Sequence, residues 1–163
     1  MRNVGFQGGS SIFEIGSSRD VDYFFCIINN EISLSEQENF FLRKVFLKYI
    51  SLSDIVEFSE IINKVKEKLM QRYPDENQVW ENLKCNNDIF YCKGDKLNWR
   101  KFNIYFDAIN HCIESSIGFH DEFKIYKPLR IVVTDMPNYI MEKIRPLAEY
   151  DALDERDTPF WLR

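Results

Sequence analysis

Two histidines are the first candidates for chemistry in this chain, because imidazole is the usual acid–base group near neutral pH. His120 is followed directly by Asp121, and His111 precedes Cys112. General acid–base catalysis requires a partner within about 3 Å in the folded chain, and adjacency in sequence does not provide one. An enzyme would therefore draw on distant segments, and the sequence offers His120, Asp121 and Cys92 for such a dispersed active site.

The four cysteines, Cys26, Cys85, Cys92 and Cys112, are the second candidates. Structural zinc sites usually contain a cysteine pair with two to four intervening residues, whereas six residues separate Cys85 from Cys92 and eighteen separate Cys92 from His111. We therefore expect no metal site. Cys26 lies in an apolar run and Cys112 on the apolar face of an expected helix, which favours buried hydrophobes over a disulfide framework. This usage is typical of a reducing cytoplasm.

Motifs that bind phosphate or activate a nucleophile are missing from the sequence. Gly8-Gly9-Ser10-Ser11 is not followed by the Gly-Lys-Ser/Thr of a phosphate-binding loop. The sequence also contains no Gly-x-Ser-x-Gly nucleophile elbow. We therefore expect no bound cofactor and no catalytic residues, and the sequence does not predict an enzyme.

The elements that must position these residues change along the chain from strand to helix and back. Residues 11–15 alternate apolar and polar, residues 16–20 are typical of a turn, and residues 21–28 are aromatic and β-branched, which predicts a hairpin. The further elements expected are helices from Ser35 and from Ser53-Asp54, a short helix at 75–84, a strand at 88–93, a helix from Asn98 to Gly118, strands at 123–126 and 129–133, and a final helix from Met136-Pro137.

This order predicts an α+β fold with an N-terminal β-hairpin, several amphipathic helices, C-terminal strands and a final helix. A chain of 163 residues with 45% hydrophobic and 29% charged residues has the composition of one globular domain. The longest apolar run has six residues, against about 20 for a bilayer span, and no secretory signal is recognised. We expect a single domain over residues 1–163.

Charge is distributed unevenly along the chain. The sequence has 21 basic and 26 acidic residues and a formal charge of −5. A negative field repels phosphate backbones and anionic lipids, so we expect neither nucleic acid nor a membrane as a partner. The same field would attract a basic protein, although an acidic surface also serves solubility alone.

The C-terminal segment, residues 150–163, combines acids with aromatic residues. Residues 149–157 hold five acids and one base, and Pro159-Phe160-Trp161-Leu162 follows. Aromatic anchors beside carboxylates suit a site for a basic protein. The alternative is that the aromatic residues enter the core while the acids face water. The partner-binding candidates predicted here are Asp151, Asp154, Glu155, Asp157 and Trp161.

With its small acidic chain, aromatic content and C-terminal acidic segment, the sequence resembles the immunity proteins of bacterial polymorphic-toxin systems, including contact-dependent growth inhibition. The resemblance is one of overall character and carries no signature motif. It implies a cytoplasmic protein that binds the C-terminal domain of its cognate toxin and blocks the active site or substrate entry. Such toxins are often nucleases, whose cationic surface suits an acidic binder.

Overall fold

A three-stranded antiparallel sheet is built from both ends of the chain. The structure, a computed structural model, describes residues 2–86, 88–135 and 145–163. Strands β1 (Asn3–Gly8) and β2 (Ser11–Ser17) form the N-terminal hairpin, and β5 (Arg130–Val133) pairs with β1 on its other edge, so the order is β2-β1-β5. The predicted N-terminal β-hairpin is therefore present.

The predicted second strand of that hairpin is wrong, because residues 21–28 lie in helix α1 (Ser18–Glu31). Ser17 caps this helix by accepting a hydrogen bond from the Asp20 backbone N–H at 3.1 Å. Residues 21–28 are buried without exception, so α1 is surrounded by protein. A continuous apolar run fits a buried strand and a buried helix equally well, and here the N-terminal cap favours the helix.

Helices α2 (Glu36–Leu47) and α3 (Ile55–Arg72) follow the predicted pattern. The capping box at the start of α2 is confirmed: the Ser35 hydroxyl accepts from the Glu38 backbone N–H, and the Glu38 carboxylate accepts from the Ser35 N–H. Asp54 precedes α3 as predicted but makes no side-chain cap. Its carboxylate lies 2.6 Å from Lys44 Nζ instead and ties the two helices together.

Two predictions between α3 and α4 are wrong. Residues 75–84 form no helix and residues 88–93 form no strand; a short hairpin of β3 (Val79–Glu81) and β4 (Lys96–Asn98) stands there. Trp80 is 3% exposed and packs edge-on against Trp99. Trp80, which the sequence pattern placed in the predicted helix, therefore anchors this hairpin to the core.

Helix α4 (Trp99–Phe123) begins where predicted, since the Asn98 side chain accepts from the Lys101 backbone N–H at 3.0 Å. It does not end at Gly118. The helix continues through Phe119 and Phe123, whose rings lie 4.7 Å apart, and Lys124 takes the left-handed C-cap conformation with φ +58°. The predicted strand at 123–126 is consequently wrong.

We expect Gly118→Ala to raise the free energy of unfolding by about 1 kcal/mol, because glycine inside a helix costs conformational entropy. A Cβ at Gly118 meets no atom within 4 Å. Gly9→Ala is the control: Gly9 has φ +56° and a Cβ there would collide with the Ser115 carbonyl, so this variant should lose stability. Urea unfolding measures both, and a destabilised Gly118→Ala would contradict the expectation.

The last elements are β5, α6 (Leu147–Asp151) and the 3₁₀ turn η1 (Phe160–Leu162). β5 confirms the strand predicted at 129–133 to within one residue. The predicted final helix from Met136 falls largely on residues 136–144, which lie outside the described residues. These elements complete the sheet, in which β5 is buried along its whole length and the opposite edge strand β2 is partly exposed.

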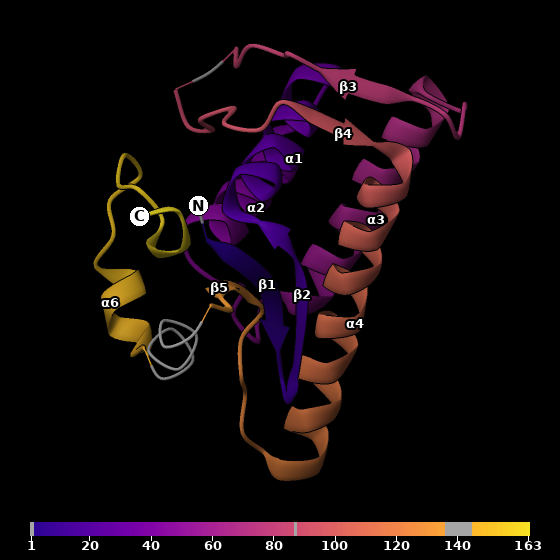
Figure 1. Cartoon of the computed structure of the whole chain (residues 1–163). Coiled ribbons are helices and arrows are strands. Elements are labelled where there is room, and N and C mark those ends of the chain that lie inside the picture. The colour runs from indigo at the N-terminus through magenta and orange to yellow at the C-terminus, as the bar shows by residue number, and fades with distance from the viewer. Residues whose placement is uncertain (1, 87, 136–144) are drawn as a thin grey trace.

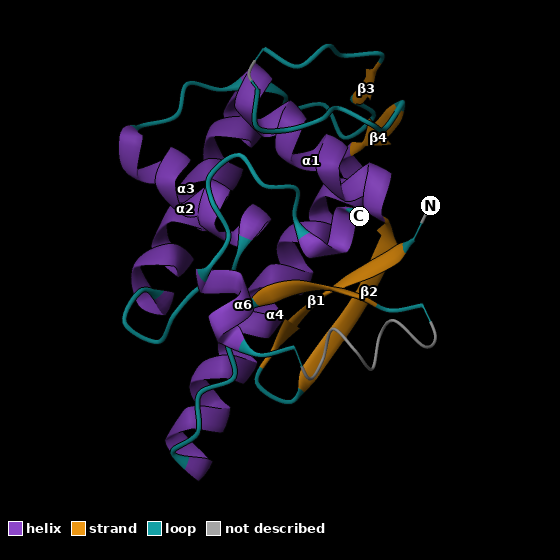
Figure 2. Ribbon diagram, turned by 90° about the vertical axis from the view of Figure 1, so that its left-hand side faces the viewer, coloured by secondary structure: helices purple, strands orange, loops and turns teal. Residues whose placement is uncertain are grey.

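The arrangement confirms the α+β fold. Helix α4 packs along β1 and β2, while α6 and the C-terminal segment lie on the other side of the sheet (Figure 1). Seen from that side, α1 lies between the sheet and helices α2 and α3 (Figure 2). None of the helices in the described ranges is long and apolar enough to cross a membrane.

Candidate protein-binding surface

The aromatic end of the C-terminal segment is an anchor to the core. Trp161 is 2% exposed, its ring packs edge-on against Phe46 at 5.2 Å, and its Nε1 donates to the Phe46 carbonyl at 2.7 Å. The structure thus gives Trp161 a different role from the predicted partner contact, because its indole faces the protein interior. Phe160 is half-buried beside it, with the Arg145 guanidinium 3.9 Å from its ring centroid.

The four acidic candidates lie on the surface, in the segment that this anchor holds. Asp151, Asp154, Glu155 and Asp157 are all exposed. Among the ion pairs that the structure describes, none involves any of these carboxylates. The acids face water while the aromatic residues enter the core.

Hydrogen bonds order the acidic stretch. The Asp154 backbone N–H donates to the Asp157 carboxylate at 2.7 Å, and the Glu155 N–H donates to the Asp154 carboxylate at 2.7 Å. Each bond occupies one oxygen of its carboxylate. The stretch is therefore a structured acidic turn, so less conformational entropy would be lost on binding a partner than with a disordered tail.

Asp151 ties this turn to the end of α2. Its carboxylate accepts from the Tyr49 hydroxyl at 2.7 Å, and its backbone carbonyl accepts from Lys48 Nζ at 3.3 Å. Burial and the neighbouring Asp151 raise the pKa of Tyr49 to about 12. The phenol consequently stays protonated and donates to Asp151 throughout the neutral range.

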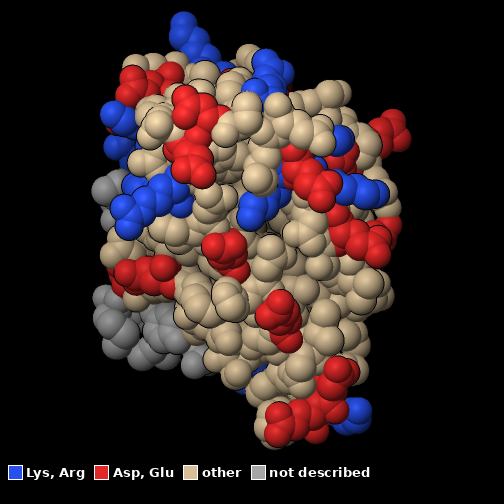
Figure 3. Space-filling model, turned by 90° about the vertical axis from the view of Figure 1, so that its right-hand side faces the viewer, with Lys and Arg blue, Asp and Glu red and all other residues tan. Residues whose placement is uncertain are grey.

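A second acidic surface, on α4, was not predicted. Residues 102–123 contain no lysine or arginine. Figure 3 shows this side of the molecule, with most basic side chains in its upper half and acidic ones continuing below. In the sequence, the absence of basic residues from this stretch is the feature that indicates the acidic surface. The exposed acids of the α4 surface are Asp107, Glu114, Asp121 and Glu122.

The residues offered for a dispersed active site are not brought together. His120 Nδ1 lies 4.0 Å from Asp121 Oδ1 at the C-terminal end of α4, whereas Cys92 is disulfide-bonded to Cys26 of α1. These places lie at opposite ends of the molecule (Figure 1). Two surface hollows, of about 510 and 220 Å³, contain none of the three residues.

The disulfide corrects the prediction that the cysteines are unpaired, and it removes the argument from cysteine usage for a reducing compartment. Cys26 is buried as expected, at 0% exposure, but its sulfur is bonded to Cys92. Cys112 fulfils its predicted role: it is buried and its thiol lies 3.3 Å from the Phe6 carbonyl. Since Cys26 and Cys92 are 66 residues apart, no local spacing indicated their pairing.

Comparison with known proteins adds no relative: no family model, no curated protein and no solved structure matches this chain. The surface described above must therefore be interpreted from its own chemistry.

Proposed function

We propose that this chain is an immunity-type inhibitor that acts in the cytoplasm and binds a basic toxin domain, such as a nuclease, through the acidic turn at Asp151–Asp157. Inhibition follows from occupancy: the bound chain covers the active site or substrate entry of the toxin. The observation that carries the proposal is the set of four exposed carboxylates, outside every described ion pair, on a turn anchored by Trp161.

The electrostatics favour a cationic partner. Arginine and lysine side chains that hold phosphate groups in a nuclease also form strong charge-assisted hydrogen bonds with carboxylates. A net charge of −5 adds long-range attraction that speeds encounter. An acidic turn on an acidic protein therefore competes with nucleic acid for the same surface.

The first experiment is co-purification with a candidate partner. The toxin candidate is the C-terminal domain of a large exported protein encoded next to this chain, and it is expressed untagged together with the tagged chain. A stoichiometric complex, with relief of toxicity in cells, supports the proposal. Separate elution of the two proteins at micromolar concentration contradicts it for that partner.

The surface is tested by removing its charge while keeping its hydrogen bonds. The quadruple variant Asp151→Asn, Asp154→Asn, Glu155→Gln, Asp157→Asn retains oxygen acceptors for the turn. We expect association with the toxin domain to slow about tenfold and to depend less on salt, because local steering is lost. Stopped-flow or surface-based kinetics at several salt concentrations measure both.

The matched control removes four charges from the α4 surface, with Asp107→Asn, Glu114→Gln, Asp121→Asn and Glu122→Gln. It changes the net charge by the same amount on the opposite side of the molecule (Figure 1). We expect it to retain most of the association rate. Equal slowing in both variants would show that net charge alone steers the encounter and would reject the acidic turn as the contact surface.

A further inference from the structure

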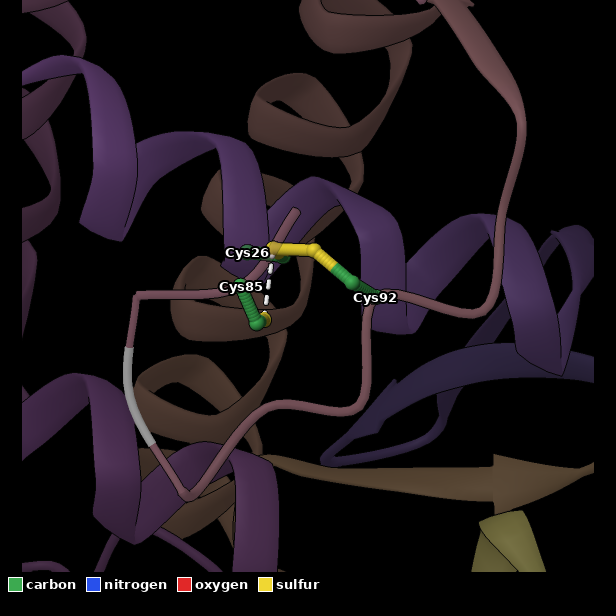
Figure 4. A group of neighbouring side chains, drawn as sticks. All are labelled: Cys26, Cys85 and Cys92. Atoms are coloured by element: carbon green, nitrogen blue, oxygen red, sulfur yellow. Dashed lines mark hydrogen bonds between the residues drawn. A yellow bond between two sulfur atoms is a disulfide. The ribbon is translucent and has the colours of Figure 1, made fainter. Parts of the chain in front are cut away.

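Three cysteine sulfurs meet at one point between α1 and the irregular segment that joins β3 to β4. Cys26 comes from α1, and Cys85 and Cys92 come from that segment (Figure 4). The Cys85 Sγ lies 2.7 Å from the Cys26 Sγ, which is bonded to Cys92, and all three sulfurs lie within 4.8 Å of one another. A disulfide needs only two of them, so the third calls for an explanation.

Each segment cysteine is held in place by its own polar side chain on α1. Asp22 accepts from the backbone N–H groups of Tyr91 and Lys93, at 2.8 and 2.7 Å, on either side of Cys92. Cys92 has φ +51°, and the two hydrogen bonds to Asp22 maintain this conformation. Asp22 lies one helical turn before Cys26, so both face the same segment.

Asn30, one helical turn after Cys26, holds the backbone around Cys85 in the same way as Asp22 holds the backbone around Cys92. Its side-chain amide donates to the Lys84 carbonyl at 2.6 Å and accepts from the Asn86 backbone N–H at 3.3 Å, on either side of Cys85. Positions 22, 26 and 30 therefore form one stripe of α1. The hydrogen bonds from Asp22 and Asn30 to the segment, one helical turn before and after Cys26, are called the two clamps. The stripe orders all three cysteines independently of the disulfide.

We propose that reduced Cys26, Cys85 and Cys92 form a three-thiolate site for a thiophilic d¹⁰ cation, Zn²⁺. Two thiolates bound to zinc at about 2.3 Å and near the tetrahedral angle lie about 3.8 Å apart. The Cys26 and Cys85 sulfurs, at 2.7 Å, and the bonded Cys26 and Cys92 sulfurs therefore move apart by about two ångströms or less when the site binds zinc, within a cluster already confined to 4.8 Å. Cys85 and Cys92 are half-buried, so water completes the fourth position. This site is independent of the proposed inhibitor function.

The disulfide and the metal site are the oxidised and reduced states of the same sulfurs. A dithiol reductant breaks the Cys26–Cys92 bond by supplying two electrons and two protons, and is itself oxidised to a disulfide. Zn²⁺ then displaces the three thiol protons to solvent.

The test is a titration of the reduced full chain with Cd²⁺, a spectroscopic substitute for Zn²⁺, under anaerobic conditions near pH 8. We expect thiolate-to-metal charge-transfer absorption that saturates at one equivalent and is displaced by Zn²⁺. Cys85→Ser should weaken binding at least tenfold, while Cys112→Ser, outside the cluster, should bind as the parent does. Absence of saturation at one equivalent, or unchanged binding in Cys85→Ser, overturns the proposal.

A second variant tests the clamp. Asn30→Ala leaves all three thiols in place but releases the backbone around Cys85, and we expect a loss of about tenfold in affinity, as for other groups that orient ligands. Zn²⁺ should also raise the melting temperature of the reduced parent and leave that of the oxidised protein unchanged. Equal shifts in both redox states would assign the binding elsewhere and reject the site.

Discussion

Trp161→Ala is expected to lower the free energy of unfolding by about 3–5 kcal/mol, the cost of removing a large buried aromatic side chain. Two terms contribute. The indole fills core volume against Phe46, and its N–H satisfies the Phe46 carbonyl, one of the last carbonyls of α2, which have no partner within their own helix. Urea unfolding monitored by circular dichroism measures the loss.

Two variants separate these terms. Trp161→Phe keeps an aromatic ring and loses only the donor, so we expect a smaller loss of about 1–2 kcal/mol. Phe160→Ala truncates the half-buried neighbour, and its effect should stay well below that of Trp161→Ala. A Trp161→Ala variant as stable as Phe160→Ala would show that the C-terminal segment is not anchored by the indole.

The same variant connects the core to the proposed function. The acidic turn precedes Trp161 by only a few residues, so its position depends on this anchor. If the turn is the partner surface, Trp161→Ala should weaken binding although Trp161 does not face solvent. A residue predicted as a contact would then act through the placement of Asp154 and Asp157.

Local signals predicted the helix boundaries that rest on side-chain chemistry. Ser35 with Glu38 and Asn98 both cap the helices they were expected to cap, because these hydrogen bonds join residues only three apart. Gly118 misled because glycine is common at helix ends, whereas the packing of Phe119 on Phe123 carries α4 further. A side-chain contact between residues four apart in the same helix outweighed the preference of glycine for a helix end there.

Sequence reasoning failed where burial is complete on all sides. The run 21–28 was interpreted as a strand, since six consecutive apolar residues follow Asp22 and helical periodicity disappears in such a run. That error also hid the cysteine cluster. The stripe of Asp22, Cys26 and Asn30 exists only if the run is a helix, and the partners of Cys26 lie 59 and 66 residues away.

The acidic candidates and the aromatic candidate differ in burial. Asp151, Asp154, Glu155 and Asp157 are exposed, as carboxylates without buried partners must be. Trp161 suits an interface and a core equally well, and its burial depended on the free carbonyl at the end of α2. That carbonyl belongs to a residue 115 positions away, beyond the reach of any local pattern.

Reduction of the Cys26–Cys92 disulfide is expected to lower the free energy of unfolding by about 4 kcal/mol. The bond closes a loop of 66 residues, and loop-closure entropy in the unfolded chain predicts a stabilisation of this size. The native segment keeps its clamps from Asp22 and Asn30, so the effect falls mainly on the unfolded state. The measurement is urea unfolding with and without a thiol reductant, in the presence of a metal chelator.

Two cysteine variants make this result specific. The double variant Cys85→Ser, Cys92→Ser should match the reduced parent and should no longer respond to the reductant, because Cys26 then has neither of its neighbouring cysteines to bond with. Cys85→Ser retains Cys26 and Cys92 and should respond as fully as the parent does. The chelator matters because a cation held by the three thiolates would cross-link the same two segments and restore part of the lost stability. Identical unfolding midpoints in oxidised and reduced protein would mean that the disulfide does not constrain the chain, and the argument for two states of one sulfur cluster would then rest on metal binding alone.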